Sequence, residues 1–163
     1  MQTWKPIEEF LEQKRIALVG ASRNPDDFSR LVMKELQSSG YEVVPVHPEA
    51  SEVAGLPAFP SVDKVDPKPD AALVMVPAKA SADVVRACGI AGVRHVWLHR
   101  ATGQGAVSDE AVREAEALGL SLVAGECPLM FLPNTKWFHR VHRFVKRIGG
   151  SLPKPEANPR PQA

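Results

Sequence analysis

The residues best suited to chemistry form a short turn after an apolar run. Ile16–Val19 is followed by Gly20, Ala21, Ser22, Arg23, Asn24 and Pro25. Glycine permits a tight turn, and a small neighbour lets a ligand approach the backbone. Backbone amides at the start of the following helix carry the positive end of its dipole and favour an anion. The turn therefore predicts a phosphate site, where the Ser22 hydroxyl would donate a hydrogen bond and Arg23 and Arg30 would add charge. The alternative is an ordinary strand-to-helix turn without a ligand.

This turn differs from two common nucleotide-binding signatures. It lacks the spacing Gly-x-Gly-x-x-Gly, and no Gly-Lys-Ser/Thr follows it as in a Walker A loop. A site for NAD also needs an acidic residue after the second strand to hold the ribose hydroxyls. That position here reads His47-Pro48, with Glu49 displaced. Both departures weaken the interpretation as a dehydrogenase.

Composition and charge narrow the class of protein. The 163-residue chain carries 20 basic and 19 acidic residues, so its formal net charge is +1. A net charge so close to zero gives no strong electrostatic attraction to nucleic acid or membranes. The two cysteines form no Cys-x-x-Cys pair, the first residues lack the apolar core of a signal peptide, and the longest apolar runs are too short for a bilayer. We therefore predict a cytoplasmic protein without a membrane segment.

Short apolar runs alternate with segments of helical period. The expected strands are 16–19, 42–46, 71–76, 93–98 and 120–123. The expected helices are 6–13, Phe28 to a stop at Gly40, 79–91, and Ser108 to a stop at Gly119. Between them, 49–69 is a proline-rich connection with a weak helical turn or an edge element near 61–65.

This alternation predicts the α/β class, as a doubly wound, Rossmann-like, five-stranded parallel sheet. An extra C-terminal helix is expected where Trp137, Val141, Phe144, Val145 and Ile148 recur at helical spacing. Residues 1–150 would form one domain, and the proline-rich tail 151–163 is expected to be disordered. Such sheets bind ligands at the carboxyl ends of their strands. The candidate segments there are 20–25, 47–48, 77–78, 99–103 and 126–128.

The expected C-terminal helix is basic. Its cations are Lys136, Arg140, Arg143, Lys146 and Arg147. A basic amphipathic helix can contact an acidic partner, a membrane surface or RNA. No aromatic platform for bases accompanies it, so the sequence disfavours nucleic acid as a partner. Trp137 and Phe138 are expected to pack onto the sheet or onto a second subunit, which leaves a homodimer or a protein partner open.

Several segments together resemble the CoA-binding domain family. They are Ile16–Pro25, Gly40–Pro48, Val96–Leu98 and Cys127. The similarity is to the small single-domain branch and to the CoA-binding domain of succinyl-CoA synthetase alpha subunits, over about Ile7 to Met130. It implies a Rossmann-like fold that binds coenzyme A across the strand ends.

By this resemblance, specific residues would line the site. Gly20, Ala21, Ser22 and Pro25 would form the phosphate turn, His47 and Pro48 would flank the adenosine, and Val76 and Pro77 would border the pocket. The family more often has Asn-Pro in place of His47-Pro48. It also often has a basic residue where this chain has Asp26-Asp27, whose charges would repel a phosphate. After the fourth strand, 99–105 is longer than the family's segment.

Cys127 lies just beyond the fifth strand, where a thiol-bearing ligand would end. Disulfide exchange with CoA or contact with a thioester is one interpretation, and it needs a lowered thiol pKa. The favoured interpretation is a small packed residue. His139 and His142 share a side of the expected helix. They could bind zinc with Cys127 or His99, but the spacing gives no clear third ligand, so no metal site and no catalytic residue is predicted.

The sequence therefore predicts a small-molecule binding module. We expect it to bind coenzyme A or an acyl-CoA as a non-catalytic carrier, sensor or regulatory module. The synthetase relatives use a phosphorylated histidine on a separate domain, and this sequence shows no such domain. Two alternatives stay open: an oxidoreductase that binds NAD(P), and an interaction protein that uses the basic C-terminal helix.

Overall fold

A five-stranded parallel sheet organises the protein. The structure is a computed structural model and describes residues 4–100 and 103–132. The strands are β1 (Arg15–Val19), β2 (Glu42–Val46), β5 (Ala71–Val74), β6 (His95–Leu98) and β7 (Ser121–Ala124). They lie in the order β2-β1-β5-β6-β7, and every neighbouring pair is parallel. The predicted fold class is confirmed.

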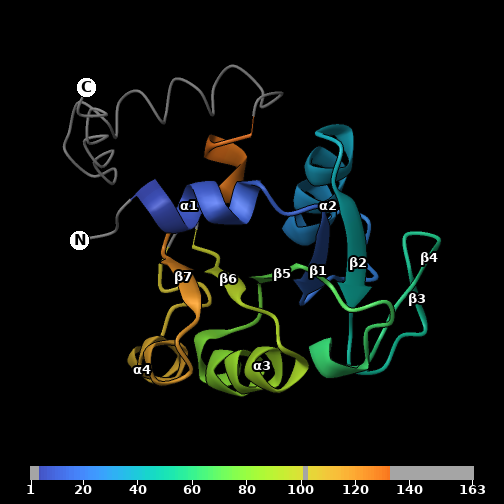
Figure 1. Cartoon of the computed structure of the whole chain (residues 1–163). Helices are drawn as coiled ribbons and strands as arrows, with labels where there is room; N and C mark the ends of the chain where they lie inside the picture. The colour runs from blue at the N-terminus through green and yellow to red at the C-terminus, as the bar shows by residue number, and fades with distance from the viewer. Residues whose placement is uncertain (1–3, 101–102, 133–163) are drawn as a thin grey trace, which may run out of the picture.

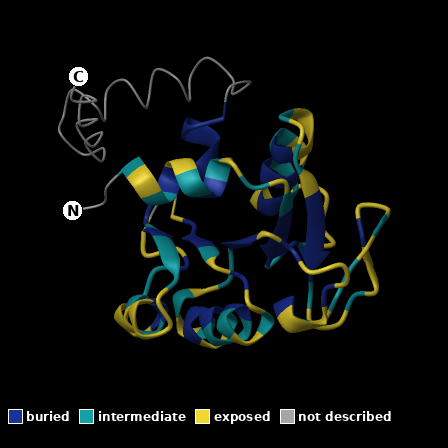
Figure 2. Ribbon diagram, in the orientation of Figure 1, coloured by how far each residue is buried: buried dark blue, intermediate teal, exposed yellow. Residues whose placement is uncertain are grey.

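Helices cover both faces of the sheet (Figure 1). One face carries α1 (Trp4–Leu11) and α2 (Phe28–Ser38), and the other carries α3 (Ala78–Ala91) and α4 (Asp109–Ala117). Alternation along each strand divides the core, because successive side chains point to opposite faces. In β1, Ile16 and Leu18 join the cluster under α1 and α2, whereas Ala17 and Val19 join the cluster under α3. In Figure 2 the buried residues, in dark blue, follow the strands of the sheet and parts of the helices that cover it.

Several element boundaries differ from the predictions. The strand expected at 71–76 ends at Val74, and the strand expected at 93–98 begins at His95. The connection 49–69 contains a hairpin that the sequence does not predict, formed by β3 (Glu52–Val53) and β4 (Leu56–Pro57). Its helical turn, η1 (Val62–Lys64), agrees with the prediction. A second short turn, η2 (Pro128–Met130), follows β7. The expected C-terminal helix and the tail 151–163 lie outside the described residues.

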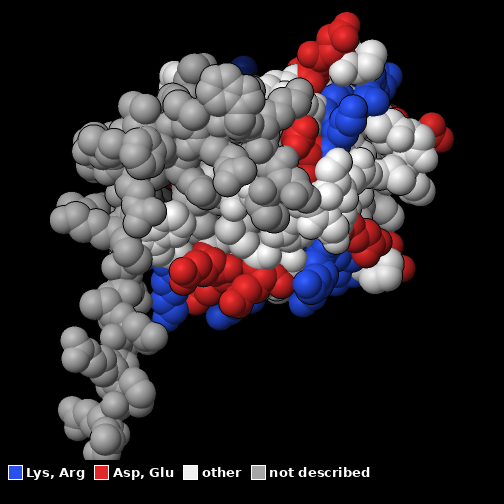
Figure 3. Space-filling model, turned by 90° about the horizontal axis from the view of Figure 1, so that it is seen from above, with Lys and Arg blue, Asp and Glu red and all other residues white. Residues whose placement is uncertain are grey.

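The surface of the described residues carries mixed charge. Figure 3 shows acidic and basic side chains interspersed on the face that carries α1 and α2. Arg86 on α3 is a clear example, because it pairs with Asp83, Glu110 and Glu114 at 2.7–2.8 Å and so ties α3 to α4. In the part of the chain that the structure describes, no helix is long and apolar enough to cross a membrane.

The strand order reverses between β1 and β5, and this reversal opens a crevice. The chain leaves β1 toward α2 on one face and leaves β5 toward α3 on the other face. Gly20 lies at this point with φ +96°, and a Cβ on it would lie 2.9 Å from the carbonyl carbon of Met75. Its amide donates to the carbonyl of Val46 at 3.2 Å. Only glycine fits here, because both the backbone angle and the neighbouring backbone exclude a side chain.

We predict that Gly20→Ala lowers the free energy of unfolding by about 2–4 kcal/mol, since backbone strain and a collision with rigid backbone add together. Gly40→Ala is the matched control, because Gly40 has φ +92° but a Cβ on it would meet nothing within 4 Å. The control should cost about 1–2 kcal/mol. Urea denaturation measures both values. Equal losses in the two variants would show that the approach to Met75 does not constrain the fold.

Candidate functional site

A cavity of about 330 Å³ lies at the reversal of the strand order. The strand ends contribute Gly20, Val46, Pro48 and Val76 to its wall, and η1 and α3 contribute Val62 and Val84. The remaining wall is also mainly apolar, with Ala80 and Ala87 as small residues on α3. A crevice outside the carboxyl ends of parallel strands is the usual ligand site of this architecture. Its apolar walls suit a flat ring better than a charged group.

The loop after β1 is held by its own side chains. The Ser22 amide donates to Ser29 Oγ at 3.0 Å, and the Asn24 amide donates to Ser22 Oγ at 3.1 Å. The Asp26 amide donates to Asn24 Oδ1 at 3.0 Å. These bonds fix the path of the loop before any ligand arrives.

Asp27 ends this network and caps α2. Its Oδ1 accepts from the Ser29 amide at 2.8 Å and from the Ser29 hydroxyl at 2.6 Å. The expectation that the amides at the helix start are open to an anion is therefore corrected at Ser29, since the chain's own carboxylate binds there. Earlier in the loop, the amides of Ala21 and Arg23 donate to no other described residue. Together with the amide of Phe28 at the start of α2, which also donates to no other described residue, these are the backbone donors left for an anion.

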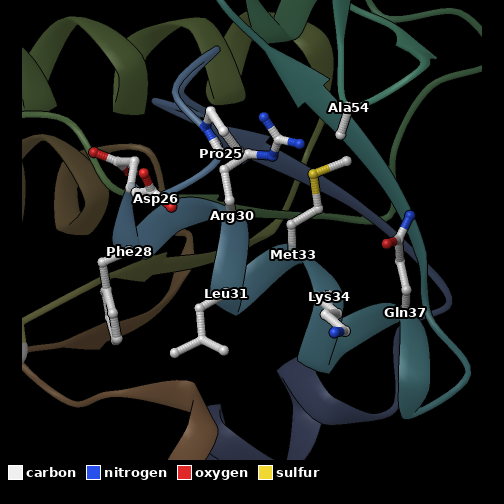
Figure 4. Close-up of a pocket in the computed structure, with 10 residues that line it drawn as sticks. Pro25, Asp26, Phe28, Arg30, Leu31, Met33, Lys34, Gln37 and Ala54 are labelled. Atoms are coloured by element: carbon white, nitrogen blue, oxygen red, sulfur yellow. The ribbon is translucent and has the colours of Figure 1, made fainter.

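Arg30 turns back toward the loop, as the phosphate hypothesis requires. Its Nη1 donates to the carbonyl oxygens of Arg23 at 3.2 Å and of Ser22 at 3.5 Å. Figure 4 shows its guanidinium beside the loop at Pro25, while Met33 points toward Ala54 in the turn of the β3–β4 hairpin. Pro25, Arg30, Met33 and Ala54 line a second cavity of about 500 Å³ along α2. A guanidinium has five N–H donors, so these bonds leave Arg30 able to bind an anion.

Of the other predicted site residues, some line the crevice and others shape the backbone beside it. Pro48 and Val76 line the crevice, together with Gly20. His47 and Pro77 instead shape the backbone, because His47 Nδ1 accepts from the amides of Glu49 and Ala50 at 3.0 and 2.9 Å, and Pro77 precedes the first turn of α3. A contact between His47 and a ligand stays a prediction.

A second region, with buried apolar residues, lies at the ends of β6 and β7. Cys127 is buried there in the core cluster that also contains Trp97. His99 follows β6 and is 8% exposed, and its ring centroid lies 5.5 Å from that of Phe28 on α2. The buried Nε2 of His99 has no hydrogen-bond partner among the described residues. Burial lowers the pKa of His99 to about 4, so the imidazole is neutral at pH 7.

Sequence reasoning placed His99 only among the strand-end candidates and as a possible zinc ligand. The signal that could have singled it out is a polar residue directly after a strand that is buried on both faces. Among the described residues, no three histidine, cysteine or acidic side chains are grouped to hold a metal ion. His139 and His142 lie outside the described residues.

Comparisons with known proteins match both the sequence and the fold of this chain. A family model described as "CoA binding domain" matches residues 14–133. The chain is 32% identical to ADP-forming acetate–CoA ligase I of Archaeoglobus fulgidus over 127 residues. The fold is similar to that of a protein from Pyrococcus horikoshii, with 32% identity, a TM-score of 0.71, and 78% of this chain and 87% of the other covered. It is also similar to the apo form of acetyl-coenzyme A synthetase 1 of Candidatus Korarchaeum cryptofilum, with 30% identity and a TM-score of 0.63.

These similarities cover different shares of the relatives. The match to the Archaeoglobus ligase includes 74% of this chain and 18% of the ligase. The match to the Korarchaeum synthetase includes 73% of this chain and 27% of the synthetase. The chain therefore spans less than a third of the length of these two enzymes.

The buried imidazole generates a prediction about acid stability. The folded-state pKa of His99 lies near 4, below the ordinary value of 6.5. Between these pH values the unfolded chain binds more protons, so the stabilisation by neutral His99 is complete above pH 6.5 and is lost as the pH falls toward 4. The loss reaches at most about 3 kcal/mol. Urea denaturation at several pH values should show a flatter acid limb for His99→Gln than for the wild type. Parallel acid limbs in the two proteins would contradict this role of His99.

Proposed function

Because this chain belongs to the CoA-binding domain family, we propose that it binds coenzyme A or an acyl-CoA in the cytoplasm, as a non-catalytic carrier, sensor or regulatory module. The observation that carries this proposal is the crevice between β1 and β5, where Gly20, Pro48 and Val76 line one cavity. The three residues come from three different strand ends and were predicted for this site from the sequence.

The crevice would hold the adenine ring. Its walls offer apolar surface from Val62 on η1 and Val84 on α3, so burial of a flat base would displace water from both. Pro48 adds a rigid surface beside the end of β2. Such pockets usually take most of a ligand's apolar surface and leave orientation to a few polar groups.

The loop after β1 would hold the diphosphate. Ala21 and Arg23 supply backbone amides, and the guanidiniums of Arg23 and Arg30 add positive charge. Asp27 caps α2 through two neutral donors of Ser29, so its carboxylate keeps its negative charge and opposes anion binding. Asp26 is exposed and adds a second repulsive charge. The two arginines would have to outweigh these two carboxylates for a diphosphate to bind.

The pantetheine arm would then cross the strand ends toward β6 and β7. Neighbouring strands are about 4.8 Å apart, so β7 lies roughly 14 Å from β1 in the hydrogen-bonding direction. An extended arm can cover such a span. Cys127 and His99 would lie near its thiol end.

Isothermal titration calorimetry of the full chain tests the proposal. We expect binding of coenzyme A and no comparable response to NAD or ATP. A selective response to NAD would instead favour the oxidoreductase. Binding of none of these ligands would overturn the proposed site.

A pocket-filling variant locates the site. Ala80→Phe places a ring in the crevice on the face of α3, and we predict that it weakens coenzyme A binding at least about tenfold, by occupying the volume that the adenine needs. Ala117→Phe is the control, because Ala117 is exposed on α4 and lines neither cavity. Circular dichroism verifies that both variants fold. Unchanged affinity in a folded Ala80→Phe variant would remove the crevice from the site.

A further inference from the structure

Arg100 lies in a cradle formed by two glycines at the ends of β6 and β7. A Cβ on Gly125, which has φ +94°, would lie 3.0 Å from Nη2 and 3.2 Å from Cζ of Arg100. On the other side, a Cβ on Gly105, with φ +57°, would lie 2.9 Å from Arg100 Cα. The guanidinium therefore packs against the bare backbone of Gly125, whereas Gly105 makes room for the Cα and Cβ of Arg100.

Backbone bonds hold this cradle in place. The Arg100 amide donates to the carbonyl of Glu126 at 3.3 Å, and the Ala106 amide donates to the carbonyl of His99 at 2.9 Å. The Glu126 carbonyl also accepts from the buried Trp97 indole at 2.8 Å. The base of the Arg100 side chain is thus anchored to the sheet rather than carried on a free loop.

The charge of Arg100 is not used within the described protein. Arg15 pairs with Glu42, Arg86 pairs with three carboxylates, and Arg30 binds two carbonyls. Arg100 makes no side-chain hydrogen bond or ion pair with any other described residue. Arg94 is also exposed and has no side-chain partner in the described part of the chain, as is ordinary for a solvated surface residue. Arg100 differs because Gly125 packs against its guanidinium and Gly105 against its Cα and Cβ, at the ligand-binding edge.

The surroundings of Arg100 define the ligand chemistry. It lies where the arm of the proposed ligand would end, next to the neutral and buried imidazole of His99 and near buried Cys127. A neutral acyl group there would leave the guanidinium in water. A carboxylate would accept two parallel N–H bonds from the fork of the guanidinium, which matches its geometry.

We infer that Arg100 selects acyl-CoA ligands whose acyl group ends in a carboxylate. The inference rests on the proposed function and deepens it, because it names the class of thioester. Adenine and diphosphate contacts would provide the shared affinity for CoA compounds. The Arg100–carboxylate pair would provide the discrimination among them.

Calorimetry on the full chain tests this selectivity with ligands matched in carbon number. Malonyl-CoA is compared with propionyl-CoA, and succinyl-CoA with butyryl-CoA. We expect at least one dicarboxylic member to bind about tenfold or more tightly than its neutral match, as for a charge-assisted hydrogen-bonded pair. Arg100→Gln should abolish the difference and leave the affinity for free coenzyme A within about twofold. Arg100→Lys should restore part of the difference, since it keeps the charge and loses the fork.

Arg94→Gln is the matched control. Arg94 is exposed and flanks the same strand at its opposite end, so this variant should keep the wild-type preference. Equal affinities for neutral and dicarboxylic thioesters in the wild type would overturn the inference and leave coenzyme A binding intact. If Arg100→Gln instead weakened the affinity for every ligand equally, free coenzyme A included, Arg100 would be assigned to binding the coenzyme A part that all these ligands share. Failure of the wild type to bind free coenzyme A would overturn the proposed function itself.

Discussion

The close approach of two backbone segments at the reversal of the strand order constrains the rest of the site. Gly20 lies so near the carbonyl carbon of Met75 that even a methyl group does not fit. Because the chain turns away from β1 here, the loop after β1 and the segment after β5 diverge to opposite faces of the sheet. Their divergence leaves the crevice that Gly20 and Val76 both line. The cavity thus follows from the order of the strands. Gly20 is required locally, because only glycine lets the backbone after β1 pass so close to the backbone at Met75.

The loop after β1 shows how a binding segment can be ordered without a ligand. Ser29 is its centre, since its hydroxyl accepts from the Ser22 amide and donates to Asp27. This order has an electrostatic consequence. The carboxylate that caps α2 takes a position that an anion could use, so the site depends more on arginines than on the helix dipole. A loop that is already ordered loses less conformational entropy on binding, which offsets part of the weaker electrostatic attraction.

The sequence was sufficient for the sheet but not for the details of the site. Apolar runs such as Ile16–Val19 are buried on both faces, so their composition alone marks them as central strands. The hairpin at 52–57 was missed because strands of two residues have no periodicity to detect. The role of His47 was also missed, because its bonds to the amides of Glu49 and Ala50 depend on a turn geometry that no spacing encodes. Predictions based on burial therefore succeeded, whereas those that depend on individual hydrogen bonds did not.

The near-neutral net charge makes the placement of single cations decisive. With 20 basic and 19 acidic residues, no long-range field draws an anionic ligand to the strand ends. Most of the cations that the structure pairs serve the fold, as Arg86 does between α3 and α4. Arg23, Arg30 and Arg100 are among the cations at the carboxyl edge of the sheet, in segments that follow β1 and β6, and Lys79 follows β5. Their separation along that edge suits a ligand with charge at two distant points and an uncharged stretch between them, which is the charge pattern of a dicarboxylic thioester of coenzyme A.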